Sequence, residues 1–158
     1  MIRLMAGGTL DHSTIGGNLF AALRSRLQGG PCRVFGEGAK VTTPQASMYP
    51  DVVVTCARFD PKSTVVPEPK LVVEVLSRST EDFDRGRKWV HYQELDSLRY
   101  YVLVSQDEVR VEVYARGDQE WGYTVLTALG DTLRIADIHV ELPLAEIYEG
   151  SSPATASS

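Results

Sequence analysis

Two apolar strands limit the folds that this chain can adopt. Residues 51–56 (DVVVTC) and 70–77 (KLVVEVLS) are strand-length and rich in β-branched side chains. Both segments are apolar at successive positions, not only at alternate ones. This pattern is typical of central strands that are covered on both faces. We therefore expect a sheet with helices packed on each side.

A first helix is expected over residues 10–30, capped by Asp11 or Ser13 and ended by Gly29–Gly30. Its apolar residues recur at helical spacing and form one stripe: Ile15, Leu19, Ala22, Leu23 and Leu27.

A second helix is expected within residues 78–95, directly after the second central strand. Ser79 or Thr80 can cap it. Phe83 and Val90 mark the side that we expect to be buried.

The remaining segments supply further strands. Residues 32–43 contain two glycines and predict a strand pair or a bent strand. Three later segments have the pattern of antiparallel strands: 98–104, 108–116 and 121–129. The second of these alternates, so its sheet should have one exposed face. Residues 142–150 predict a short closing helix, and the tail 151–158 should be disordered.

The order of elements predicts an α/β (α+β) fold with a central mixed sheet flanked by helices, in one domain of residues 1–150. No apolar run approaches the ~20 residues of a membrane span, and the N-terminus lacks the apolar core of a signal peptide. Cys32 and Cys56 lack C-x-x-C spacing. We expect them to be reduced, partly buried thiols of a cytoplasmic protein.

The formal net charge is −5. This charge argues against a general nucleic-acid-coating protein, which would be strongly basic. It is compatible with a nuclease, because a metal site needs carboxylates and the bound cation changes the local field.

Two carboxylates lie in the apolar strands. Asp51 begins the first strand, and Glu74 lies inside the second, between Val73 and Val75. A buried, unpaired carboxylate is strongly destabilising, so Glu74 needs a partner. One interpretation is a purely structural ion pair with a basic residue: Arg33, Lys40 or Lys88.

The other interpretation is a metal site. If the two strands are neighbours, Asp51 and Glu74 converge at one end of the sheet. Like charges at close range favour a divalent cation between them. Carboxylate oxygens suit hard ions such as Mg²⁺ or Mn²⁺.

Lys88 is a third candidate residue. It lies four residues after Asp84 and four before Tyr92, so the three share one stripe of the second helix. This stripe is either a surface ion pair beside a packed tyrosine, or a lysine held by Asp84 and directed at the carboxylates.

The ordered pattern of residues 49–56 (YPDVVVTC) and 71–92 (LVVEVLSRSTEDFDRGRKWVHY) resembles the Uma-type family of restriction endonucleases, within the PD-(D/E)XK nuclease superfamily. The resemblance covers nearly the whole chain. It implies a restriction-endonuclease-like fold, metal binding by Asp51, Glu74 and the main-chain carbonyl of Val75, and hydrolysis of DNA phosphodiester bonds.

One position departs from the superfamily pattern, which has a lysine two residues after the glutamate where this chain has Leu76. Lys88 is the expected substitute. His12 matches a family position often occupied by histidine, which implies an accessory site residue; the alternative is a capping or packing histidine.

Three hypotheses follow from these patterns. The first is a Mg²⁺- or Mn²⁺-dependent DNA endonuclease with Asp51, Glu74 and Lys88 as its catalytic set. The second is a catalytically inactive nuclease-fold module that binds DNA or protein. The third is a structural protein in which Glu74 is only ion-paired. We also expect a homodimer, because exposed sheet edges can pair between subunits.

Overall fold

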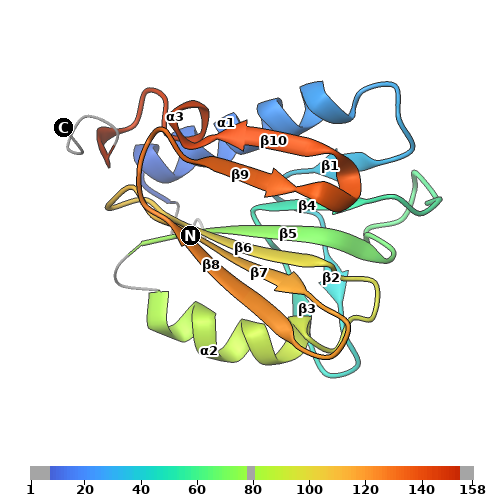
Figure 1. The fold of residues 1–158 in the computed structure, drawn as a ribbon. Coiled ribbons are helices and arrows are strands. Elements are labelled where there is room, and N and C mark those ends of the chain that lie inside the picture. Colours follow the sequence, from blue (N-terminus) through green and yellow to red (C-terminus); the bar gives the residue numbers. More distant parts are fainter. Residues whose placement is uncertain (1–7, 78–80, 154–158) are drawn as a thin grey trace, which may run out of the picture.

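A mixed six-stranded sheet forms the centre of the protein, in the strand order β1-β4-β5-β6-β7-β8 (Figure 1). The structure is a computed structural model that describes residues 8–77 and 81–153, except the side chains of residues 81–85. Its strands are β1 (Arg33–Phe35), β4 (Val52–Thr55), β5 (Pro69–Leu76), β6 (Tyr100–Ser105), β7 (Val111–Arg116) and β8 (Trp121–Leu126). The β5–β6 pair is parallel and the other neighbours are antiparallel. The predicted mixed sheet is therefore confirmed.

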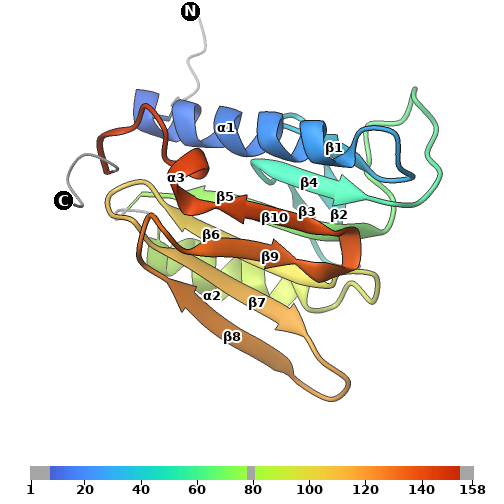
Figure 2. The same cartoon turned by 45° about the horizontal axis from the view of Figure 1, so that its top comes forward.

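Helices cover both faces of this sheet. Helix α1 (Leu10–Leu27) lies on one face and α2 (Glu81–Tyr92) on the other (Figure 1). The smaller elements are β2 (Val41–Thr42), β3 (Ser47–Met48), β9 (Thr132–Ile135), η1 (Ala136–Ile138), β10 (Val140–Pro143) and α3 (Leu144–Ile147). The β9–β10 hairpin and α3 pack on the same side as α1 (Figure 2). Among the described residues, none of the helices is both apolar enough and long enough to cross a membrane.

Strand β5 contributes to both apolar layers, as its sequence predicts. Alternate residues join the layer beneath α1: Leu71, Val73 and Val75. Their neighbours join the layer beneath α2: Val72 and Leu76. By the same alternation, Glu74 belongs to the α2 face of the sheet.

Helix α1 buries the expected stripe, and its five apolar residues are all in the core. Its N-cap differs from the prediction of Asp11 or Ser13. The hydroxyl of Thr9 accepts a hydrogen bond from the backbone N–H of His12 at 3.0 Å. The carboxylate of Asp11 instead accepts from the backbone N–H of Ser152 at 3.1 Å.

The folded domain extends past residue 150, beyond which a disordered tail was predicted. Ser151 is buried, and Ser152 is bound to Asp11, so residues 151–153 belong to the folded domain. The predicted disorder of residues 154–158 lies outside the described part of the chain. The proposed caps Ser79 and Thr80 also lie outside it, as does the side chain of Phe83.

The segment 32–43 does not form a strand pair with itself or a bent strand. Strand β1 pairs with β4, and β2 pairs with β3. The glycines instead form a turn between β1 and β2, where Gly38 has a φ of +96° that favours glycine.

Two predictions of side-chain direction were wrong. Val90 is 60% exposed, because the inward face of α2 presents Trp89 and Tyr92 to Tyr101. Glu112 is only 3% exposed, because α2 covers this face of the sheet and the hydroxyl of Tyr123 donates to its carboxylate. Strand β7 therefore has no fully exposed face at this position.

The prediction of reduced thiols was also wrong, because Cys32 and Cys56 form a disulfide. The β1–β4 register pairs Arg33 with Thr55, so the next position along each strand brings the two cysteines opposite each other. The bond joins the end of β4 to the start of β1.

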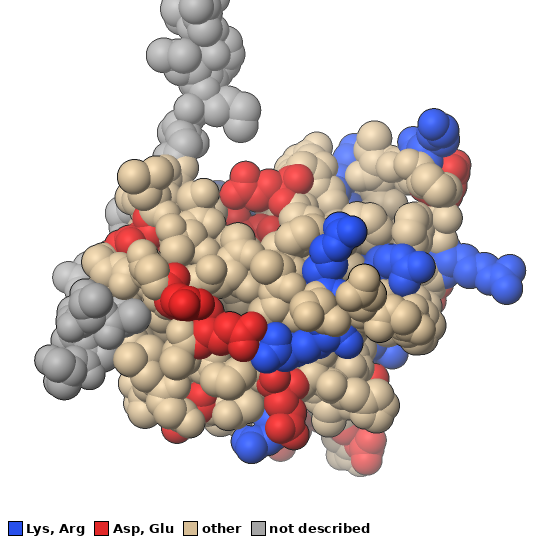
Figure 3. Space-filling model, turned by 90° about the horizontal axis from the view of Figure 1, so that it is seen from above, with Lys and Arg blue, Asp and Glu red and all other residues tan. Residues whose placement is uncertain are grey.

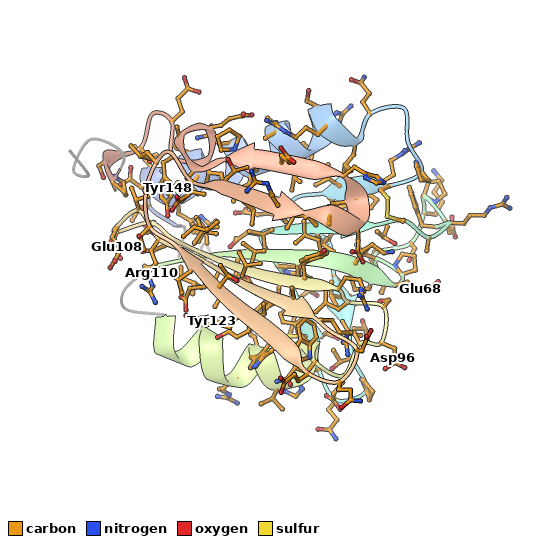
Figure 4. All side chains as sticks on the ribbon, viewed as in Figure 1. Glu68, Asp96, Glu108, Arg110, Tyr123 and Tyr148 are labelled. Atoms are coloured by element: carbon orange, nitrogen blue, oxygen red, sulfur yellow. A yellow bond between two sulfur atoms is a disulfide. The ribbon has the colours of Figure 1, made fainter. Side chains whose placement is uncertain are left out.

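Tyr148, just after α3, holds the turn between β6 and β7 (Figure 4). Its hydroxyl donates to the carbonyl of Ser105 at 2.7 Å and accepts from the backbone N–H of Arg110 at 3.1 Å. The adjoining Gln106 accepts from the hydroxyl of Thr9. This turn therefore lies beside the N-terminus of α1.

Candidate metal centre

Asp51 occupies the point at which β4 begins. Val52 pairs with Val73, so the same register brings Asp51 beside Glu74. Strand β5 extends past this point, and the backbone N–H of Val75 donates to Asp51 Oδ2 at 2.7 Å. The carboxylate thus takes the place of a main-chain acceptor that β4 no longer supplies.

Glu74 lies beside two side chains of α2. It is 3% exposed. Lys88 Nζ is 3.1 Å from Glu74 Oε2, and the hydroxyl of Tyr92 donates to the same oxygen at 3.4 Å. Of the three basic residues considered from the sequence, Lys88 is the one placed at this carboxylate.

Tyr92 is fully buried in the layer between α2 and the sheet. Burial, followed by the nearby charge of Glu74, raises the pKa of Tyr92 far above its ordinary value. The phenol is therefore a neutral donor to Glu74. The predicted stripe of α2 is present for Lys88 and Tyr92, whereas the side chain of Asp84 lies outside the described residues.

His12 lies in the first turn of α1 and faces Asp51. Its Nε2 is 3.2 Å from Asp51 Oδ1. The hydrogen bond to Asp51 raises the pKa of His12, against the opposing effect of partial burial. A Cβ at Gly8 would lie 2.9 Å from the His12 ring, so glycine permits the close approach of the chain. The imidazole is therefore directed at the candidate site.

Glu37 is a candidate residue that the sequence patterns did not indicate. It lies on the turn between β1 and β2, between Gly36 and Gly38. One potential ligand atom from each of His12, Glu37 and Asp51 lies within 4.8 Å of the others. The glycines on both sides are a weak sequence signal for a turn, but nothing in the spacing relates Glu37 to Asp51.

The face of the protein seen from above carries both kinds of charge. Acidic and basic side chains adjoin one another in several places there, and uncharged surface covers much of the rest (Figure 3). A phosphate group approaching Glu37 and Asp51 would meet repulsion, which a bound cation would relieve.

The mixed sheet, its covering helices and the acidic residues at adjoining strand positions define a restriction-endonuclease-like fold. The chain belongs to the Uma2 family, described as "Putative restriction endonuclease", whose model matches residues 1–145.

Two proteins of Synechocystis sp. (strain ATCC 27184 / PCC 6803 / Kazusa) are similar to the chain. It is 36% identical to the uncharacterized protein slr1290 over 152 residues, covering 94% of this chain and 80% of that protein. It is 31% identical to the uncharacterized protein sll1609 over 130 residues, covering 77% of this chain and 72% of that protein.

The fold is also similar to a crystal structure described as a putative nuclease belonging to DUF820 from Anabaena variabilis ATCC 29413. The TM-score is 0.68 at 19% sequence identity, over 94% of this chain and 84% of that one. This likeness supports the fold.

Proposed function

We propose that this protein is a divalent-metal-dependent endodeoxyribonuclease that uses Mg²⁺ or Mn²⁺ to hydrolyse phosphodiester bonds. The observation that carries the proposal is the contact of Lys88 with Glu74 at the end of the sheet where Asp51 also lies. Membership of the Uma2 family supports the same reaction class.

Asp51 and Glu74 would hold the metal, with the main-chain carbonyl of Val75 as a further ligand. The residues fit a hard cation, because they offer carboxylate and carbonyl oxygens. When bound, a divalent ion supplies Lewis-acid stabilisation of negative charge on the scissile phosphate. The hydrogen bond from Val75 N–H fixes the direction of the Asp51 carboxylate before any ligand arrives.

Lys88 would orient the attacking water and stabilise charge on the phosphate. Leu76, at the usual lysine position, is buried on the same face of β5 as Glu74. Because α2 covers that face, Lys88 of the helix reaches the Glu74 carboxylate. Lys88 would thus replace a lysine at position 76 of the strand. In this proposal Asp84 and Tyr92 are accessory residues that position Lys88 and Glu74, and His12 is an accessory residue beside Asp51.

The proposal includes a homodimer, since two copies can act on the two strands of a duplex. Strand β8 lies at one edge of the six-stranded sheet, and Trp121–Leu126 contains no charged residue that would oppose pairing with a second copy. Sedimentation velocity should give the mass of a dimer; a monomer at micromolar concentration would contradict this part of the proposal.

The test of the proposed function is cleavage of plasmid and single-stranded DNA with Mn²⁺ or Mg²⁺. Asp51→Asn and Glu74→Gln should abolish cleavage. Glu68→Gln and Asp96→Asn are matched controls, and both residues are labelled in Figure 4. Glu68 lies before the start of β5, whereas Glu74 lies near its end, and Asp96 follows the C-terminal end of α2. Equal cleavage by wild type and the two site variants would overturn the proposal. DNA binding without cleavage by the wild type would favour the inactive binding module.

A further inference from the structure

Three metal-ligating side chains converge from separate parts of the fold. His12 comes from α1, Glu37 from the turn after β1, and Asp51 from the residue before β4. One potential ligand atom of each lies within 4.8 Å of the other two. Separate elements therefore bring an imidazole and two carboxylates to one point.

The two oxygens of Asp51 have different environments. Oδ2 accepts from the backbone N–H of Val75 at 2.7 Å, and Oδ1 faces His12 Nε2 at 3.2 Å. Glu74 Oε2 lies instead beside Lys88, on the α2 face of the sheet. The oxygen that faces His12 and the oxygen that faces Lys88 thus belong to different carboxylates.

An open cleft of about 370 Å³ gives access to this group. His12, Glu37 and Asp51 line it together with Gly16 and Gly17 of α1. A Cβ built on either glycine would meet nothing within 4 Å, so the floor of the cleft leaves free space. The volume is sufficient for an ion that keeps several waters, each of which occupies roughly 30 Å³ in the liquid.

The charge of the group matches a divalent cation. With a neutral imidazole, the carboxylates of Glu37 and Asp51 provide two negative charges. Glu37 is exposed at the tip of a turn, so its side chain can adjust to an ion at low cost. Helix α1 therefore holds His12, the hydrogen bond from Val75 holds Asp51, and Glu37 can adjust to the ion from the turn.

We propose that His12, Glu37 and Asp51 form a second cation position, which binds Mn²⁺ in preference to Mg²⁺. Imidazole nitrogen is a good ligand for transition metals, whereas Mg²⁺ favours oxygen ligands and retains its water. A mixed set of one nitrogen and two carboxylates therefore selects Mn²⁺. The position shares Asp51 with the proposed nuclease centre and depends on that proposal for its role in cleavage, but its binding of Mn²⁺ can be measured without any cleavage.

The test is a titration of the full chain with Mn²⁺, in which electron paramagnetic resonance measures the concentration of free Mn²⁺. The wild type should bind two Mn²⁺ ions. Glu37→Gln and His12→Gln should each lose one of them, with its affinity reduced at least about tenfold, or roughly 1.4 kcal/mol. Pulsed measurements should detect nitrogen coupling to bound Mn²⁺ in the wild type and in Glu74→Gln, and no such coupling in His12→Gln.

Glu120→Gln is the matched control, because Glu120 is also an exposed glutamate on a turn. It should bind Mn²⁺ as the wild type does. Mg²⁺ added to the wild type should displace Mn²⁺ from the position of Asp51 and Glu74 at low concentration. Much more Mg²⁺ should be needed to displace Mn²⁺ from the position of His12, Glu37 and Asp51.

Two results would overturn the inference: unchanged Mn²⁺ stoichiometry and affinity in Glu37→Gln, or absence of nitrogen coupling in the wild type. Failure of the nuclease proposal is distinguishable, because it would leave Mn²⁺ binding intact while no DNA is cleaved.

Discussion

Lys88 Nζ lies 3.1 Å from Glu74 Oε2, although the lysine belongs to helix α2 and the carboxylate to strand β5. Glu74 is 3% exposed, and a carboxylate buried to this extent is costly without a compensating cation. The contact therefore links the packing of α2 on the sheet to the charge balance of the candidate centre.

Replacing Lys88 by methionine should lower the rate of DNA cleavage by roughly 10²–10³-fold, because it removes a charged donor from the reacting phosphate. The measurement is single-turnover cleavage at saturating Mn²⁺. Lys62→Met makes the same chemical change in an exposed loop and should cleave normally. Wild-type rates in Lys88→Met would remove Lys88 from the catalytic set.

Tyr92→Phe should weaken Mn²⁺ binding by roughly tenfold, because the phenol helps to hold Glu74. Its unfolding free energy should fall by only about 1 kcal/mol, since one hydrogen bond is lost. Calorimetric titration and thermal melting measure the two effects. Tyr148→Phe is the control: it should lose stability at the β6–β7 turn and keep its Mn²⁺ affinity. Equal Mn²⁺ affinities in all three proteins would contradict the role of Tyr92.

The ion pair of Arg26 and Glu146 should make a pH-dependent contribution to stability. The guanidinium donates to both carboxylate oxygens, at 2.9 and 2.8 Å, and joins α1 to α3. The side-chain hydrogen bond from Arg26 lowers the pKa of Glu146. A lowered pKa in the folded state means that the contribution is present above the ordinary glutamate pKa and is lost as pH falls through the lowered value.

Glu146→Gln should therefore lower the free energy of unfolding by roughly 0.5–1 kcal/mol at neutral pH, because the pair is partly exposed. The difference from wild type should shrink as the pH falls below the ordinary glutamate pKa and the Glu146 carboxylate becomes protonated. Urea denaturation at neutral pH and in acid measures it. A constant difference across this range would show that the carboxylate charge is not responsible.

Reduction of the Cys32–Cys56 disulfide should lower the free energy of unfolding by roughly 3 kcal/mol, because the bond closes a loop with a sequence separation of 24 residues. Thermal melting with and without reductant measures the effect. Cys32→Ser should melt at the lower temperature and show no response to reductant. A wild-type melting temperature that reductant leaves unchanged would contradict the prediction.

The central strands and the convergence of the two acids could be predicted from the sequence because they depend on local patterns. Apolar residues at successive positions of β4 and β5 indicate coverage on both faces. Once these strands are neighbours, their antiparallel register brings Asp51 beside Glu74. Helical spacing likewise related Lys88 to Tyr92, although it could not show which way the pair points.

The remaining features depend on contacts between distant segments. Glu37 reaches the site because β1 pairs with β4, and the same pairing brings Cys32 opposite Cys56. The burial of Glu112 requires Tyr123 from the next strand. The periodicity of a single segment contains no information about these neighbours, so the sequence predicted an exposed sheet face at residues 108–116 and two reduced thiols.

The hydrogen bond from Val75 to Asp51 has a consequence for how this site could change. The side chain of Asp51 accepts the hydrogen bond from the backbone N–H of Val75 and also faces His12. Both contacts constrain the length of the side chain at this position. A glutamate there would carry the same charge but would extend one methylene too far to satisfy the backbone donor in this geometry. The architecture of the sheet itself therefore discriminates between the two acidic amino acids, independently of any ion.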